Sequence, residues 1–434
     1  MLFGKEGFLK WNIGKYLVGY EITEKKVQIS YLQVGKDTPE TVSTTVGIED
    51  YDIPLALFKA YGESQWYFGK EAIERAETVG EGVFLENLLD LATKEELIPV
   101  ENESYNGVAL LALFIRRSFS YLPFFSKADS IGGITFVLPE LTEERIQSMR
   151  QALDILKLQN MEVRFIGKQE SFYHYNMHTD PVLWKDRVYL YEMQGNQLSS
   201  LCMEQNRRTK PIVITVQSKE YPPFVGEMAL DDRTKEWWDQ EFFKLAKTDL
   251  EEKEASTIYL IGDGFAGNWY SQSLQYLCNN RRVFAGNNLY SRGACFFLQD
   301  LSDTDKQRTT VFLGEDKVLA NVGVEVSAKG EPSYLSLIEG GQSWYHCSGS
   351  FHLILWESNR LVIKITPLDG KDVREVAMVL RGLPAEENRG CRIHLQVKMK
   401  NRREMTITVE DLGFGDYFPS TNQVFTENFE LYSS

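Results

Sequence analysis

The sequence predicts an α/β protein with two similar lobes, followed by a separate antiparallel β-sandwich. The order hairpin, strand, helices, strand, helix occurs twice between residues 16 and 302, which is typical of a duplicated α/β lobe. After Leu298 the helical spacing of apolar residues gives way to alternation, which predicts strands with one buried face. We therefore expect a first lobe at 1–182, a second lobe at 183–302, a linker at 303–321 and the sandwich at 322–434.

The first lobe begins with two β-rich runs that flank the polar turn Thr23-Glu24-Lys25, which predicts a hairpin. Its clearest unit is a strand–helix–strand passage, and a strand joined to the next by one helix predicts parallel pairing. The expected strands are Tyr16–Glu21, Lys26–Gln33, Thr41–Thr45, Ile131–Leu138 and Met161–Ile166, and the expected helices lie at 104–122 and Glu143–Leu158.

The second lobe repeats this order with a hairpin, a third strand, a helix and a strand that ends in glycines. The expected strands are Arg187–Gln194, Leu198–Glu204, Pro211–Val216 and Thr257–Ile261, and the expected helices are Asp231–Thr248 and Asn268–Asn279. From Thr309 to Leu431 six or more short alternating runs are separated by turns, which predicts the sandwich.

Composition excludes several classes of protein. The 47 lysines and arginines stand against 62 aspartates and glutamates, a net charge of −15, which argues against nucleic acid as a partner. The apolar run Val108–Phe114 is far below the roughly 18 residues of a spanning helix, so no transmembrane segment is expected. Five widely separated cysteines predict free thiols in the cytoplasm. His174 and His178 lack a nearby third ligand, so no metal site is expected.

The order of elements resembles the actin-like ATPase superfamily, and the added sandwich makes the chain similar to the heat-shock-seventy chaperones. Val18–Thr23 lies where that family has its first phosphate hairpin, and Ile258–Gly264 resembles its adenosine motif. Leu380–Pro384 followed by Ile393–Val397 resembles motifs of its substrate domain. The resemblance spans nearly the whole chain and implies a two-lobed, ribonuclease-H-like body. In contrast to that family, we expect no α-helical lid after the sandwich.

The resemblance also implies which residues a nucleotide site would use. Its cofactor-binding positions fall on Gly19, Thr23, Gly195, Gly262 and Gly264. Its candidate catalytic carboxylates, which would position Mg²⁺ and water, are Glu21, Glu170 and Glu192.

The phosphate loops depart from the family's pattern. Thr23 replaces a glycine, and Tyr191–Gln197 keeps one glycine of three, although phosphate cradles rely on glycine turns. We expect Gln194 and Gln197 to project into the phosphate space. Residues 217–256 hold one helix where the family has a subdomain that covers the adenine. We therefore expect a degenerate site without a cofactor, or with ATP and Mg²⁺ if it is functional.

Three functions stay open at this point. The favoured one is a divergent, non-hydrolysing chaperone or scaffold whose sandwich binds an extended peptide or protein partner through β-type contacts. The alternatives are an active ATP-dependent chaperone ATPase and an actin-like structural assembly protein. Whether the protein is an enzyme is left open.

The resemblance places a peptide pocket at Ser327, Phe351 and Ile363 in the sandwich. Strand alternation puts Val324 and Val326 on one face and Ser327 on the other. Phe351 can equally be an ordinary core residue of the sandwich, and both interpretations stay open.

Overall fold

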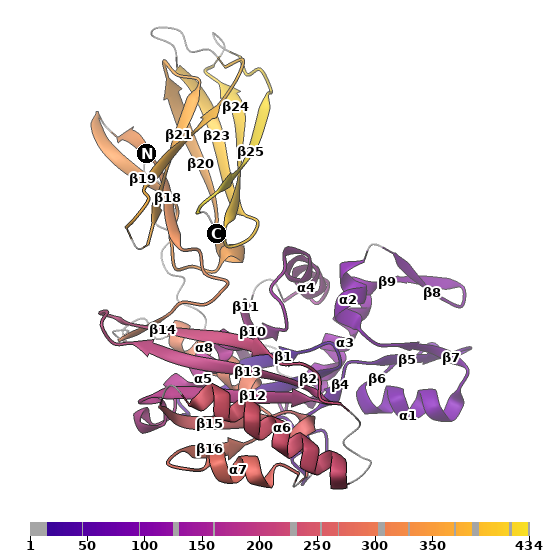
Figure 1. The fold of residues 1–434 in the computed structure, drawn as a ribbon. Coiled ribbons are helices and arrows are strands. Elements are labelled where there is room, and N and C mark those ends of the chain that lie inside the picture. The colour runs from indigo at the N-terminus through magenta and orange to yellow at the C-terminus, as the bar shows by residue number, and fades with distance from the viewer. Residues whose placement is uncertain are drawn as a thin grey trace. The chain divides into compact units, whose positions relative to one another are not determined.

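The computed structural model contains helices and several sheets, and it divides the chain into two compact units, Met1–Gly314 and Glu315–Ser434 (Figure 1). It describes residues 15–432 except 46, 95, 125–129, 159–160, 226–231, 252–253, 268, 303–308, 329, 369, 384–389 and 416–418. The division falls within the predicted linker 303–321. Residues 1–14 of the predicted first lobe and 303–308 of that linker lie outside the described residues.

Two large sheets of the first unit share one strand order and one set of directions. In each, the first strand pairs antiparallel with the second and parallel with the fourth, and the fifth strand extends the parallel side. The first sheet is β11 (Glu162–Gly167), β10 (Ile131–Leu138), β1 (Tyr16–Ile22), β2 (Lys26–Gln33) and β3 (Glu40–Thr41), with β4 (Ile53–Pro54) also on β2. The second is β16 (Arg282–Ala285), β15 (Ala255–Ile261), β12 (Arg187–Gln194), β13 (Gln197–Asn206), β14 (Ile212–Glu220) and β17 (Thr310–Phe312).

Two central helices connect these sheets, because each helix follows one sheet in the chain but packs on the other sheet. Helix α5 (Lys168–Met177) follows the last strand of the first sheet, yet its Phe172 packs with Val188 and Leu190 of the second sheet. Helix α8 (Leu289–Ser302) follows the second sheet, yet its Cys295 packs with the first. The two helices also pack against each other, so each sheet is held by the helix of the other.

Glycines allow the close approach at this crossing. A Cβ atom on Gly293 of α8 would lie 2.2 Å from the carbonyl oxygen of Ser171 in α5. A Cβ atom on Gly19 of β1 would lie 1.9 Å from the carbonyl oxygen of Ser291. Neither distance is compatible with a methyl group, so backbone touches backbone at both positions.

The remaining elements of the first unit lie around this centre. A small part between β4 and α3 (Gly107–Ser118) holds the sheet β6 (Tyr67–Phe68), β5 (Leu57–Ala60) and β7 (Gly82–Leu85), the hairpin β8 (Leu97–Val100) and β9 (Glu103–Asn106), and helices α1 (Gly69–Val79) and α2 (Leu88–Thr93). Helix α4 (Glu143–Ile155) joins β10 to β11, and α6 (Asp232–Leu250) and α7 (Ser271–Leu277) flank the second sheet (Figure 1).

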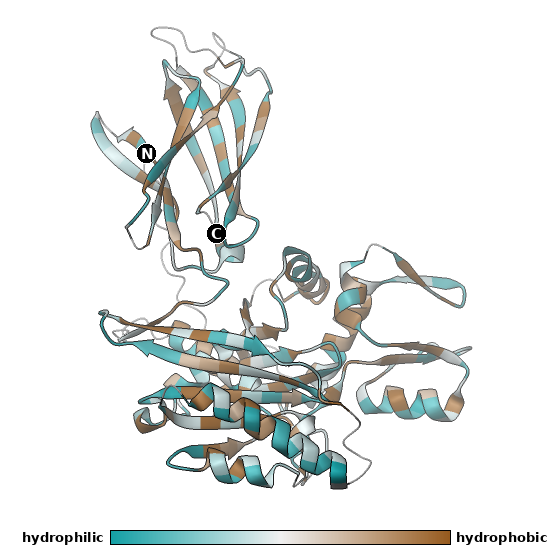
Figure 2. Cartoon of the chain, viewed as in Figure 1, coloured by the Kyte–Doolittle hydropathy of each residue, from teal (hydrophilic) through white to brown (hydrophobic). Residues whose placement is uncertain are grey.

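The second unit is built of two four-stranded antiparallel sheets. Alternate residues along β21, β23 and β24 are buried, and Figure 2 shows the matching bands of hydropathy along the strands. One sheet is β19 (Glu331–Ile338), β18 (Ala320–Ala328), β21 (Arg360–Pro367) and β22 (Arg374–Val379). The other is β20 (Ser348–Trp356), β23 (Gly390–Met399), β24 (Glu404–Gly413) and β25 (Val424–Glu430).

Four local predictions were wrong in extent. The helix expected at 104–122 spans only Gly107–Ser118, because residues up to Asn106 belong to strand β9 and a short 3-10 helix follows at Phe119–Tyr121. The strand expected at Thr41–Thr45 ends at Thr41, because the side chains of Ser43, Thr44 and Thr45 bond to groups of Asp50 and neighbouring backbone in a loop. The helix expected to reach Leu158 ends at Ile155, before the left-handed residue Lys157. The helix expected at Asn268–Asn279 spans only Ser271–Leu277, and Asn268 lies outside the described residues.

Gly293→Ala tests the helix crossing. We expect this methyl group to force α5 and α8 apart and to lower the free energy of unfolding by about 1–3 kcal/mol or more. Gly286→Ala is the matched control, because a Cβ there meets nothing within 4 Å, and its effect should stay within about 0.5 kcal/mol. Equal stabilities of the two variants in denaturant unfolding would contradict the close contact.

Candidate functional site

A cluster of charged side chains lies where the two sheets and the two central helices meet. Glu21 stands near the end of β1 and Glu192 near the end of β12, the first strands of the two sheets. Lys168 is the first residue of α5, and Tyr290 is the second residue of α8. The repeated topology therefore brings together four groups from four different elements.

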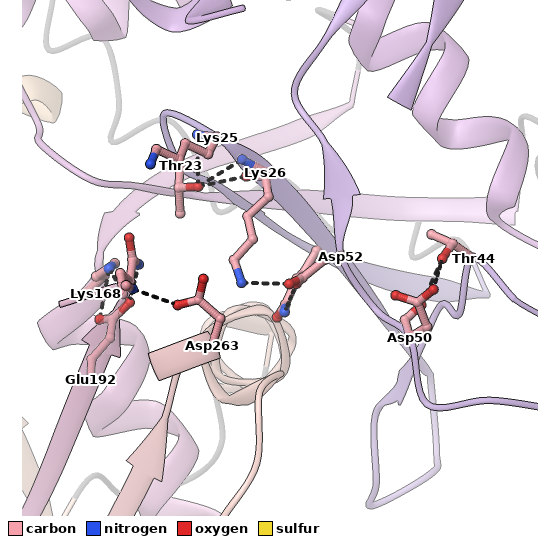
Figure 3. A network of polar contacts seen from close by, with 12 residues as sticks. Thr23, Lys25, Lys26, Thr44, Asp50, Asp52, Lys168, Glu192 and Asp263 are labelled. Atoms are coloured by element: carbon pink, nitrogen blue, oxygen red, sulfur yellow. Dashed lines mark hydrogen bonds and ion pairs between the residues drawn. The ribbon is translucent and has the colours of Figure 1, made fainter. Parts of the chain in front are cut away.

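Lys168 and Glu192 form the centre of the cluster (Figure 3). The ammonium donates to both carboxylate oxygens of Glu192, at 2.8 Å and 2.9 Å. Burial disfavours the charged ammonium, but Glu192 and Glu21 outweigh that effect and raise the pKa of Lys168. Tyr290 donates its hydroxyl to Glu192 Oε2 at 3.1 Å, and Gln194 donates to Glu192 Oε1 at 2.6 Å. Three donor groups therefore make four hydrogen bonds to one buried carboxylate.

Glu21 is buried beside this pair, with a side chain that is only 6% exposed. Burial raises its pKa to about 7, with Lys168 opposing the rise and Glu192 adding to it. Among the described residues no hydrogen bond reaches the Glu21 carboxyl group. A carboxylic acid with this pKa exchanges its proton near neutral pH, so the charge of the cluster changes there.

The turn of the first hairpin is held by hydrogen bonds to the side chain of Thr23. Thr23 Oγ1 accepts the backbone N–H groups of Lys26 at 3.1 Å and Lys25 at 3.4 Å, and donates to the Lys26 carbonyl (Figure 3). Lys26 Nζ pairs with Asp52 Oδ2 at 2.7 Å, and Gln28 donates to the other oxygen of Asp52. The amides of this turn are therefore directed into the turn.

The second hairpin is fixed by the loop after β15. The N–H of Gly195 donates to Asp263 Oδ1 at 3.0 Å. Gly262 adopts φ +99°, and its Cβ would lie 2.2 Å from the Met193 carbonyl oxygen. The Cβ of Gly264 would meet the Met193 side chain at 2.5 Å. Both glycines are thus needed for contact between this loop and the hairpin.

The two glutamines of the second hairpin behave differently. Gln194 donates to Glu192 Oε1, inside the cluster. Gln197 stands opposite Gln194 in the hairpin, but its side chain donates to the Tyr221 carbonyl at 2.7 Å, just past the end of β14. The expectation that Gln197 fills the phosphate space was wrong. Glu170 is buried in the first turn of α5.

The predicted peptide residues lie on three strands of two sheets in the second unit. Ser327 is exposed on β18 and pairs with Pro332. Ile363 is fully buried on β21. Phe351 is half-buried on β20, and its ring lies over Gly349, whose Cβ would be 2.5 Å from Phe351 Cε2.

His174 and His178 share one carboxylate partner. Asp300 of α8 bonds to His174 Nδ1 at 2.7 Å and to His178 Nε2 at 2.8 Å. Burial opposes ionisation, but these bonds and the two imidazoles lower the pKa of Asp300. His174 of α5 and His178, the residue directly after α5, therefore help to hold α8 in place.

Sequence reasoning missed Lys168, Tyr290 and Asp263 as members of the site. The signal for Lys168 is its place directly after strand β11, where the ends of parallel strands meet. Tyr290 and Asp263 carry no such signal, because only the fold brings them to Glu192 and Gly195.

A family profile described as "Family of unknown function (DUF5716) C-terminal" matches residues 38–315. The chain belongs to this family. Its match covers Lys168, Glu192 and Asp263 but not the β1–β2 hairpin with Glu21. A second profile, described as "Domain of unknown function (DUF8552)", matches residues 317–431. The two matches thus meet where the two compact units divide. No curated protein matches the chain.

Glu21→Gln tests the buried acid. Because the folded protein holds this proton up to about pH 7 and the ordinary value is 4.5, the stabilisation is complete below pH 4.5 and is lost as the pH rises through about 7. We expect the free energy of unfolding of the native chain to fall across this window by up to about 3 kcal/mol relative to Glu21→Gln. Parallel pH profiles of the two proteins would contradict the assignment.

Lys168→Met tests the ion pair. It leaves two buried carboxyl groups without their counter-charge, and we expect a loss of stability near the lower end of about 3–5 kcal/mol, because Lys168 is 25% exposed. Lys168→Arg should retain most of the stability. Lys244→Met, which removes an exposed pair with Glu241, should cost less than about 1 kcal/mol. Similar losses for Lys168→Met and Lys244→Met would exclude a special role for Lys168.

Proposed function

We propose that this chain is a divergent relative of the heat-shock-seventy chaperones that does not hydrolyse ATP and serves as a binding platform. In this proposal the first unit is a two-lobed, actin-like body. The second unit is a β-sandwich that binds an extended peptide or a segment of a partner protein.

Two features of the fold support the proposed body. The two large sheets repeat one strand order, as duplication of a lobe requires. Helices α5 and α8 exchange sheets, so the repeat extends to the helices. The two four-stranded antiparallel sheets of the second unit, with their alternating burial, support the proposed sandwich.

The absence of hydrolysis rests on one observation, namely that the turn amides already have partners. A phosphate cradle needs backbone N–H groups that point at the ligand. The N–H groups of Lys25 and Lys26 are bonded to Thr23, and that of Gly195 is bonded to Asp263. As arranged, these residues do not fit a bound triphosphate.

The carboxylates support the same conclusion for Mg²⁺. A hard divalent cation takes carboxylate oxygens as ligands, but Lys168 bonds to both oxygens of Glu192. Glu21 is held partly protonated near neutral pH by burial, which raises its pKa. We therefore derive no hydrolytic step for these residues.

Thermal unfolding of the full chain with and without ATP and Mg²⁺ tests this proposal. A nucleotide at 100 times its Kd would stabilise the folded state by about 2.7 kcal/mol. We expect no change in Tm beyond that caused by Mg²⁺ alone, and no release of phosphate. A higher Tm with ATP together with steady turnover would favour an active ATPase instead.

Phe351→Ala tests the peptide site. A half-buried pocket residue should lower binding to a library of extended peptides while Tm changes little. Leu395→Ala is the matched control, because Leu395 stands opposite Phe351 on β23 and is fully buried, so it should cost about 2–5 kcal/mol of stability. If Phe351→Ala unfolds the second unit as Leu395→Ala does, Phe351 is core and the pocket assignment fails.

A further inference from the structure

The second unit has four sheet edges, and three of them carry the residues that protect an edge strand. Exposed edges pair with other chains unless charges, prolines or bulges prevent it. β19 carries Glu331 and Pro332, β22 carries Arg374 and Glu375, and β25 carries Glu427 and Glu430.

The fourth edge strand, β20, has none of these protections. Its sequence SGSFHLILW contains no lysine, arginine, acid or proline over nine residues. It pairs with β23 along its whole length, from Ser348 opposite Lys398 to Trp356 opposite Gly390. In the described part of the chain, no strand and no backbone hydrogen bond pairs with its other edge, although β19 of the facing sheet lies beside its first residues, near Gly349.

The edge also carries apolar surface that its own sheet does not cover. Ile354 is 56% exposed and Trp356 is 57% exposed on one face. On the opposite face Phe351, Leu353 and Leu355 are only half-buried. Another strand along this edge would cover both rows.

We propose that this edge pairs with the same edge of a second copy of the chain. The partner strand would run antiparallel about a two-fold axis at His352, which makes the contact isologous. This axis places Phe351 opposite Leu353, Ser350 opposite Ile354, Gly349 opposite Leu355 and Ser348 opposite Trp356.

The size of the residues supports this partner over an unrelated segment. The three residues at the start of β20 are small and the three at its end are large, so the three outer pairs across the axis each join a small side chain to a large one. The inner pair joins the apolar side chains of Phe351 and Leu353. No pair brings two charges together. The result is a continuous sheet of eight strands in which the outward N–H and C=O groups of both copies are bonded.

The pairing does not depend on the nucleotide site, and it needs no bound peptide, although Phe351 of β20 belongs both to this edge and to the proposed peptide pocket. It requires only that β20 keeps its pairing with β23 and its free edge. Failure of the proposed chaperone-like function would therefore leave this inference in place. Failure of the dimer would equally leave the proposed function in place.

Sedimentation equilibrium of the full chain tests the dimer. We expect a reversible monomer–dimer equilibrium whose Kd rises by about tenfold or more in Ile354→Lys, because the added ammonium is buried without a counter-charge. Val379→Lys is the matched control, since Val379 is 44% exposed on the charged edge β22, and its Kd should equal that of the native chain. A native chain that stays monomeric, or equal effects of the two lysines, would overturn the proposal.

Oxidative cross-linking tests the register. His352→Cys places two thiols opposite each other across the axis, where Cβ atoms are about 4.5–5.5 Å apart, close to disulfide reach. Ser348→Cys places them at opposite ends of the paired strands. We expect a covalent dimer from His352→Cys and none from Ser348→Cys or from the native chain with its five cysteines. Equal cross-linking of the two variants would assign the dimer to another surface and overturn the proposal.

Discussion

The first unit depends on the crossing of α5 and α8, where backbone meets backbone. Each helix leaves one sheet and packs on the other, so the two sheets cannot separate without moving both helices. The carbonyl oxygens of Ser171 and Ser291 come so close to Gly293 and Gly19 that no side chain has room. The same contact brings the first turns of both helices to the end of β12, which places the Lys168 ammonium and the Tyr290 hydroxyl on Glu192.

That arrangement sets the charge balance of the site. Two buried carboxyl groups close together need a counter-charge or a proton. Here Lys168 supplies the first and the raised pKa of Glu21 supplies the second. In a site built for a metal–triphosphate group, the cation arrives with the ligand. In our proposal the Lys168 ammonium takes the place of that cation. The two hairpins therefore keep one arrangement without a ligand. The functional surface then lies in the second unit.

Much of this fold was accessible from the sequence. The hairpins at β1–β2 and β12–β13 and the unit β10–α4–β11 follow from local apolar patterns and turns. Helix α5 was not predicted, because consecutive residues from Glu170 to Tyr173 are all buried between the sheets and no apolar stripe remains in the pattern. Glu21 and Glu192 could be placed at one site only through resemblance to a family. Lys168, 24 residues from Glu192 in the chain, meets it only through the helix crossing.

A double-mutant cycle between Lys168 and Glu192 measures the central interaction most directly. The free energy of unfolding of the native chain, Lys168→Met, Glu192→Gln and the double variant gives the coupling of the two side chains, separate from their contacts with other groups. If the Lys168 ammonium is the counter-charge of the site, we expect a favourable coupling above about 1 kcal/mol, at the level found for residues in one buried network. A coupling within about 0.5 kcal/mol of zero would mean that the two residues act independently, and the charge balance described here would be wrong.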